Sequence, residues 1–360
     1  MNRSTRRVRV GIATLAAFAL VGAACGGDDD SQDEPSSGTE AAAESTAEAA
    51  DEPVAEPAAE TDGEPFRVAI VAPSAQNDLA FTQSIVDSVN RVGEGRSIDV
   101  DITDGTFVVE DAAAAMRGYA EDGFDLVIAH GSQYGGPLQE IAPDFPDVAF
   151  AWGTAADTFG IDNVSAYTVR ADEGGYVNGT IAAQLTGSNT LGVVGPIEVG
   201  DAKLYVDGFV AGVEAQNPDA TVNVNYIESF SDVALASEAA TAHVTNGADV
   251  LTGTAQMVVG ATGVALESDI PWFGTQSNQT PLGESIVVAS QVYHWEVVLD
   301  EIIDNIQAGS LGGEVYTATL ANGGLVMEFN DAYGLDASIK SAAEETIAAI
   351  ASGELSTGVE

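Results

Sequence analysis

The stretch "VAIVAPSAQNDLAFTQSIVDSV", residues 68–89, joins a short apolar run to an amphipathic pattern through a polar loop. The apolar run ends at Pro73, and Phe81, Ile85 and Val89 then recur at intervals of four, which predicts a helix with one buried face. A buried strand followed by such a helix is the first half of a unit in which parallel strands alternate with helices. The stretch therefore favours an α/β fold.

The same alternation recurs along the chain. Most of the apolar runs end in Gly, Pro, Ser or Gln, as strands buried on both faces of a parallel sheet do. Tyr205, Phe209 and Val213 mark a second helical face between two of them. The runs cover residues 67–73, 97–102, 124–131, 148–153, 164–169, 190–196, 221–227, 248–254, 270–276 and 285–292.

These runs are too many for one small sheet, and they fall into two blocks that meet in "NVSAYTVRADEGGYVNGTIAAQLTG", residues 163–187. We predict two three-layer α/β lobes with a ligand cleft between them. Hinge segments are expected near Thr168, Ser290 and Gly324. The predicted lobes comprise residues 66–168 plus about 290–324, and 169–289 plus about 325–360.

The N-terminus has the pattern of an export signal, predicted over residues 1–24. Four arginines precede an apolar stretch that is too short to span a bilayer comfortably. "GAAC" then leads into Cys25, the only cysteine, and resembles a bacterial lipobox with Gly22 where Leu or a similar residue is usual. We predict that Cys25 is lipidated and anchors the protein to the outer face of the membrane. The alternative is an ordinary secretory signal with an incidental thiol.

Residues 25–65 are rich in Ala, Glu, Asp, Ser and Pro and contain no aromatic residue after Cys25. Such a segment cannot bury enough apolar surface to fold, so it is predicted to be a disordered, extended tether. The remaining body has seven cations and 42 of the chain's 56 acids, a net charge near −35. This charge excludes nucleic acid as a partner and disfavours anionic ligands. Composition leaves open whether it reflects a salty habitat.

The loop of the opening stretch is the first candidate site. Asn77, Asp78 and Phe81 lie between the predicted strand and the start of the predicted helix. Ligands of parallel sheets bind at the carboxyl ends of strands. Phe81 offers a stacking face for a flat ring, and the two polar side chains offer hydrogen bonds to its edge. The alternative is that Asn77 caps the helix and Phe81 packs in the core.

Other polar or aromatic candidates follow later strands, namely Gln133, Tyr134, Gly253 and Gln256. A metal site is not expected, because His130, His243 and His294 have no further ligand at metal-binding spacing. An enzyme is not expected either, since the chain lacks an activated nucleophile and a phosphate loop. No cofactor is predicted.

The whole body resembles the basic membrane protein (BMP) family of solute-binding lipoproteins, including its PnrA-like branch. The resemblance spans roughly residues 66–329 and rests on the shared order of several motifs. These are "NDLAF" (77–81), "GFDLVIAHGSQYGGPLQEIAPDFPDVAFAW" (123–152), "ADEGGYVNGTIAA" (171–183), "GFVAGVEAQNPDATVNVNYIESFSD" (208–232), "NGADVL" (246–251) and "FGTQSNQ" (273–279).

The resemblance implies a type I periplasmic-binding fold and delivery of a solute to an ABC permease and ATPase. In the nucleoside-binding branch the opening loop holds the base, and Asn77, Asp78 and Phe81 match that loop. Gln276 and Tyr293 stand where the family has the Asp and Lys that hold ribose. Trp295 follows the same strand end as Tyr293. Because both replacements are neutral, a free purine base or another neutral heterocycle rivals a nucleoside.

We therefore expect an exported, lipid-anchored, monomeric receptor for a small neutral heterocycle. Two alternatives stay open at this point. One is a signalling receptor that reports its ligand to a membrane partner, and the other is a hydrolase similar to a nucleosidase.

Overall fold

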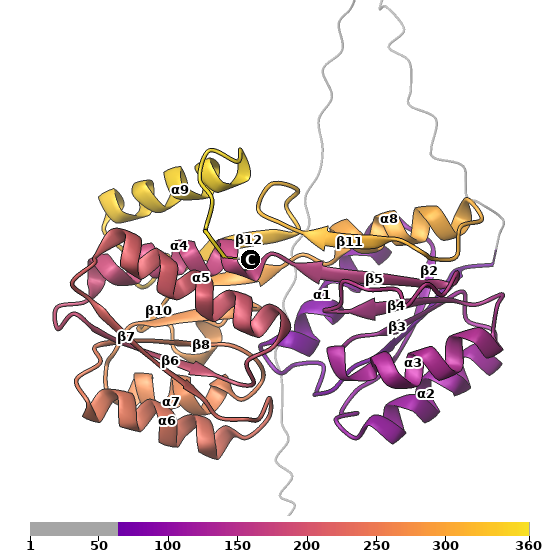
Figure 1. Ribbon diagram of the computed structural model, residues 1–360, viewed down its shortest axis with the longest axis horizontal. Coiled ribbons are helices and arrows are strands. Elements are labelled where there is room, and N and C mark those ends of the chain that lie inside the picture. Colours follow the sequence, from indigo (N-terminus) through magenta and orange to yellow (C-terminus); the bar gives the residue numbers. More distant parts are fainter. Residues whose placement is uncertain (1–63, 360) are drawn as a thin grey trace, which may run out of the picture. The chain divides into compact units, whose positions relative to one another are not determined.

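The computed structural model describes residues 64–359 (Figure 1). The predicted signal, Cys25 and nearly all of the predicted tether lie outside these residues. Within them the chain forms two six-stranded sheets, each covered by helices on both faces. The predicted α/β class with two three-layer lobes is confirmed.

The first sheet has the strand order β11-β5-β4-β3-β1-β2, and all of its pairs are parallel. Its central strands are buried on both faces, whereas the edge strand β2 alternates between exposed and half-buried residues. The strands are β1 (Phe66–Val71), β2 (Ile98–Thr103), β3 (Leu126–Ala129), β4 (Ala149–Gly153), β5 (Val164–Val169) and β11 (Val315–Ala318).

The second sheet has the order β12-β10-β9-β8-β6-β7, and only β12, which pairs with β10, runs antiparallel. Its edge strand β7 repeats the alternating burial of β2. The strands are β6 (Thr190–Gly195), β7 (Thr221–Tyr226), β8 (Val250–Gly253), β9 (Trp272–Gln276), β10 (Val287–Tyr293) and β12 (Leu325–Phe329).

Alternate residues of each strand face different helices. On the first sheet, Val68 and Ile70 pack toward α1 and α8, while Ala69 and Val71 pack toward α2 and α3. On the second sheet, α5 covers one face and α6 with α7 the other. The helices are α1 (Phe81–Gly95), α2 (Val109–Glu121), α3 (Gly135–Ile141), α4 (Ala171–Leu185), α5 (Gly200–Gln216), α6 (Val233–Thr245), α7 (Val258–Glu267), α8 (Glu296–Gln307) and α9 (Ala337–Ala351).

The chain passes between the two sheets three times. It leaves β5 at Arg170 to begin α4, leaves β10 at residues 294–295 to begin α8, and runs from β11 to β12 through residues 319–324. Strand β10 belongs wholly to the second sheet, so the second crossing lies about four residues after the predicted position near 290. The first crossing comes two residues after Thr168, and the third ends at Gly324. Residues 64–359 include no helix that is both long and apolar enough to cross a bilayer.

Helices α4 and α5 approach each other unusually closely because glycines line their contact. Gly175 and Gly179 of α4 face the backbone of α5, and Gly208 and Gly212 of α5 face the backbone of α4. A Cβ at Gly212 would lie 2.1 Å from the carbonyl oxygen of Tyr176, a distance that no real Cβ adopts. This contact fixes α5, whose first turn contributes to the site described below.

We expect Gly212→Ala to lower the free energy of unfolding by roughly 1–3 kcal/mol, because the added methyl group must push α4 and α5 apart. Gly263→Ala in α7 is the matched control, since a Cβ there meets no atom within 4 Å. It should raise the free energy of unfolding by about 0.5–1 kcal/mol through helix propensity alone. Urea denaturation of both variants measures the difference, and equal effects would contradict the close approach of the two helices.

Candidate functional site

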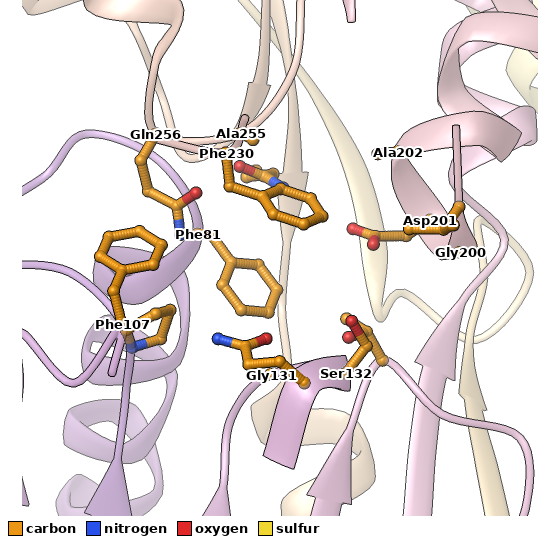
Figure 2. Close-up of a pocket in the computed structure, with 15 residues that line it drawn as sticks. Phe81, Phe107, Gly131, Ser132, Gly200, Asp201, Ala202, Phe230, Ala255 and Gln256 are labelled. Atoms are coloured by element: carbon orange, nitrogen blue, oxygen red, sulfur yellow. The ribbon is translucent and has the colours of Figure 1, made fainter. Parts of the chain in front are cut away.

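A cavity lies among the loops that follow the parallel strands of both sheets (Figure 2). Each lining residue belongs to, or comes after, the carboxyl end of one of β1–β4 or β6–β9. The cavity volume is about 30 Å³, so the walls nearly meet. The lining residues are Pro73, Phe81, Phe107, Gly131, Ser132, Gln133, Thr154, Val199, Gly200, Asp201, Ala202, Phe230, Ala255, Gln256 and Gln276.

Three aromatic rings enter the cavity. Phe81 comes from the start of α1 and Phe107 from the loop after β2, whereas Phe230 comes from the loop after β7 in the second sheet. Figure 2 shows Phe81 and Phe230 bordering the same space near the centre of the site. A flat ring between them would contact aromatic surface from both lobes.

A buried histidine supports the ring of Phe81 from behind. The rings of Phe81 and His130 stack with centroids 3.9 Å apart and an interplanar angle of 14°. His130 Nε2 donates to the carbonyl oxygen of Phe81 at 3.2 Å, so Nδ1 accepts from the hydroxyl of Tyr167 at 2.7 Å. Burial lowers the pKa of His130 to about 3, against the opposing effect of its hydrogen bond to the backbone of Phe81. The imidazole is therefore neutral and holds Phe81 in place.

The loop before α1 is organised by Asp78. Its carboxylate accepts hydrogen bonds from the backbone N–H groups of Ala80 at 2.9 Å, Thr82 at 3.1 Å and Gln83 at 3.0 Å. These donors are the free N–H groups at the start of α1, so Asp78 acts as the helix cap. Neither Asp78 nor Asn77, which is exposed, is among the residues lining the cavity. The cap places Phe81, the next helical residue, at the wall.

The loop after β6 brings a carboxylate that the sequence analysis did not single out. Asp201, in the first turn of α5, is the only charged lining residue of this cavity. Tyr293 Oη donates to Asp201 Oδ2 at 3.2 Å. Burial raises the pKa of Asp201, while hydrogen bonds from the side chains of Tyr293 and Gln276 oppose the shift. Gln276 and Tyr293, the two neutral residues that stand where the family has the Asp and Lys that hold ribose, thus both bond to Asp201.

The structure separates the predicted site residues into two groups. Phe81, Gln133, Gln256 and Gln276 line the cavity. The remaining candidates, Asn77, Asp78, Tyr134, Gly253, Tyr293 and Trp295, are not among its lining residues.

Three of the candidates outside the lining are packed closely in the interior of the protein. Tyr134 is fully buried, and its hydroxyl bonds with the hydroxyl of Thr106 at 2.9 Å. Trp295 is also fully buried and donates from Nε1 to Ser84 Oγ at 2.9 Å. Gly253 ends β8, where a Cβ would lie 2.6 Å from the carbonyl oxygen of Val194.

The backbone of the cavity is strained at three places. Thr154, Ala255 and Gln276 adopt left-handed conformations, with φ of 54°, 74° and 71°. Such conformations are costly for residues other than glycine and gather at binding and catalytic sites. Across residues 64–359, His, Cys, Asp and Glu form no cluster of three or more that could hold a metal ion.

Comparison with known proteins points to solute binding. The family model of the PnrA-like ABC transporter substrate-binding proteins matches residues 66–355. A purine-binding protein of Brucella abortus (strain 2308) is 30% identical over 255 residues, which cover 68% of this chain and 69% of that protein. The nucleoside-binding protein BmpA of Lactococcus lactis subsp. cremoris (strain MG1363) is 28% identical over 189 residues, covering 47% and 54%.

A solved structure extends the comparison to the fold. The ABC transporter solute-binding protein from Conexibacter woesei (DSM 14684) superposes with a TM-score of 0.68 and 27% identity, covering 81% of this chain and 98% of that one. Both the family resemblance noted from the motifs and the expected fold are thereby confirmed.

The buried histidine predicts a pH dependence of stability. The unfolded chain binds a proton at His130 near pH 6.5, whereas the folded chain does so only near 3. Between these values the unfolded state holds the extra proton, so stability falls as the pH falls, by up to about 1.4 kcal/mol per pH unit. His130→Gln should reduce the slope of unfolding free energy against pH by this amount between pH 6 and 4. Urea denaturation across that range tests it, and an unchanged slope would contradict the neutral, buried imidazole.

Proposed function

Because the chain belongs to the PnrA-like family of ABC transporter substrate-binding proteins, we propose that it binds a flat, uncharged heterocycle, a purine nucleoside or purine base, and delivers it to an ABC importer. Members of this family bind solutes for transport, so the protein is a binding protein and not an enzyme. The finer proposal concerns which solute is bound and how.

The observation that carries the proposal is the pair of phenylalanines from opposite lobes in one cavity. Phe81 follows β1 of the first sheet and Phe230 follows β7 of the second. Stacking of a base on an aromatic ring contributes about 1–3 kcal/mol in nucleic-acid-binding proteins. A ring held between the two phenylalanines would also hold the lobes together.

The charges around the cavity favour an uncharged ligand over an anion. Among the residues that line it there is no cation. Arg170 and Lys203, which come after β5 and β6, are already paired with acids. Arg170 forms two hydrogen bonds of 2.8 Å to Asp172, and Lys203 contacts Asp207 at 2.5 Å. A ligand phosphate or carboxylate would therefore lack the Arg or Lys that such groups usually recruit.

The names of the two relatives agree with this ligand class. One is called a purine-binding protein and the other a nucleoside-binding protein. We carry the class to this chain, whose cavity combines aromatic walls with amide side chains that can bond the edge of a ring. The amides are those of Gln133, Gln256 and Gln276.

Ligand entry requires the walls to separate, because the space inside is far smaller than a base. Two hydrogen bonds join the loops of the two lobes here. Ser277 Oγ donates to the carbonyl oxygen of Ala80 at 2.8 Å, and Gln279 Nε2 donates to that of Leu79 at 3.3 Å. We propose that these bonds break on opening and that the three crossing segments serve as the hinge.

Phe230→Ala should weaken binding of purine nucleosides about tenfold to hundredfold, through the loss of one stacking face. Phe230 is only half-buried, so its removal leaves the core intact. Phe159→Ala is the matched control, because Phe159 is 36% exposed, stacks on Trp152 and does not line the cavity. Titration calorimetry with adenosine, guanosine and inosine measures both. Equal losses in the two variants, or none in either, would refute the stacking role.

We further propose that the protein is exported and anchored by a lipid on Cys25, which lies outside the described residues. The proposal rests on the basic start, the short apolar stretch and the single cysteine after it. In membrane fractionation, wild type should sediment with membranes and Cys25→Ser should appear in the soluble or secreted fraction. Equal release of both proteins would rule out the lipid anchor.

A further inference from the structure

We propose that Asp201 selects the ligand by accepting two hydrogen bonds from adjacent N–H donors on the edge of a heterocycle, an edge of the guanine type. The inference deepens the proposed function and rests on it. It concerns which ring the site prefers, and it assigns that choice to a residue outside the "NDLAF" loop.

The position of Asp201 places its carboxylate at the edge of a ring stacked between the phenylalanines. Asp201 is the second residue of α5 and comes from the loop after β6. Figure 2 shows its carboxylate pointing toward the space that Phe81 and Phe230 border. Tyr293, which is fully buried, donates to Oδ2, and the side chain of Gln276 also bonds to the carboxylate. These bonds fix the orientation of the carboxylate. Because each carboxylate oxygen can accept more than one hydrogen bond, both can still accept from a ligand.

The polar groups of the cavity have a surplus of acceptors. The buried side-chain oxygens of Gln256 and Gln276 have no hydrogen-bond partner in the described structure. A carboxylate can only accept, and no cation among the lining residues neutralises it. A buried acceptor left without a donor costs free energy, so a well-bound ligand must bring N–H or O–H groups.

The shape of a carboxylate determines which donors fit best. Its two coplanar oxygens match two parallel N–H bonds, as in its bidentate pairing with arginine. Guanine carries such a pair, because its ring N1–H lies beside the 2-amino group. Hypoxanthine keeps N1–H and lacks the amino group. Adenine and cytosine place an amino group beside an unprotonated ring nitrogen, which would face a carboxylate oxygen with its lone pair.

Three nucleosides that differ at this edge test the proposal on the wild-type protein. Inosine lacks only the 2-amino group of guanosine, and 1-methylguanosine carries a methyl group in place of the hydrogen on the ring nitrogen N1. We expect guanosine to bind about tenfold to hundredfold more tightly than either, since each loses one hydrogen bond to a charged acceptor. Titration calorimetry gives the ratios without any variant.

Asp201→Asn then assigns the preference to this side chain. An amide offers one acceptor and one donor, so the variant should bind guanosine at least tenfold more weakly and bring guanosine and inosine within about threefold of each other. Asp207→Asn is the matched control on the same helix, because Asp207 pairs with Lys203 and does not line the cavity. It should keep the wild-type ratio.

The outcomes separate the two proposals. If wild type binds guanosine and inosine equally, or if Asp201→Asn keeps the wild-type preference, the role of Asp201 is refuted and purine binding stands. If no purine or nucleoside binds, while another class of solute does, the proposed function itself fails.

Discussion

Parallel pairing of strands is the constraint on which the site depends. Strands that run in the same direction end at the same edge of a sheet, and loops that follow them gather there. In this protein the loops after β1–β4 and after β6–β9 all contribute to one cavity. Residues as distant in sequence as Pro73 and Gln276 therefore share a wall. The antiparallel β12 adds no lining residue, because its carboxyl end points the other way.

The electrostatic design follows from how few cations the chain contains. Each of the seven cations in the described residues already has a partner. Arg91 pairs with Glu296, Arg96 with Asp300 and Asp304, and Arg117 with Asp144, while Arg67 donates to the carbonyl oxygen of Asp122. Arg170, Lys203 and Lys340 pair with Asp172, Asp207 and Asp331. Burial alone would raise the pKa of Glu296, but hydrogen bonds from His294 and Arg91 lower it to about 2. The cavity is left with an acid, neutral amides and aromatic rings.

The strand positions could be predicted because burial on both faces leaves a continuous apolar run. All ten predicted runs overlap a strand, and the residues spaced by four in α1 and α5 are buried. The second crossing was placed too early because Ser290 lies inside a strand whose apolar run is interrupted by polar residues. Ser290 and Gln291 are both buried, and Ser290 Oγ accepts a hydrogen bond from the backbone N–H of Gln279. Sequence alone does not show that two such polar residues are buried within the sheet.

The site was less predictable, since side chains at a strand end can turn either way. Asp78 and Phe81 are three residues apart, yet the carboxylate turns to the helix N-terminus and only the ring faces the cavity. Tyr293 ends β10 and Trp295 comes two residues later, but both are fully buried and neither lines the cavity. Asp201 was missed although an acid five residues after the end of the run "TLGVVGP", in the loop after a buried strand, was a usable signal. Phe230 lies in the motif of residues 208–232, but nothing in that motif marks it as a residue that lines the cavity.

The account centres on a ring held between the two lobes, and a crystal structure of the protein grown with guanosine tests it most directly. The account predicts the base between Phe81 and Phe230, with N1 and the 2-amino nitrogen each within hydrogen-bond distance of an oxygen of Asp201. Guanosine bound elsewhere on the protein, or bound in the cavity with its ring against neither phenylalanine, would contradict it.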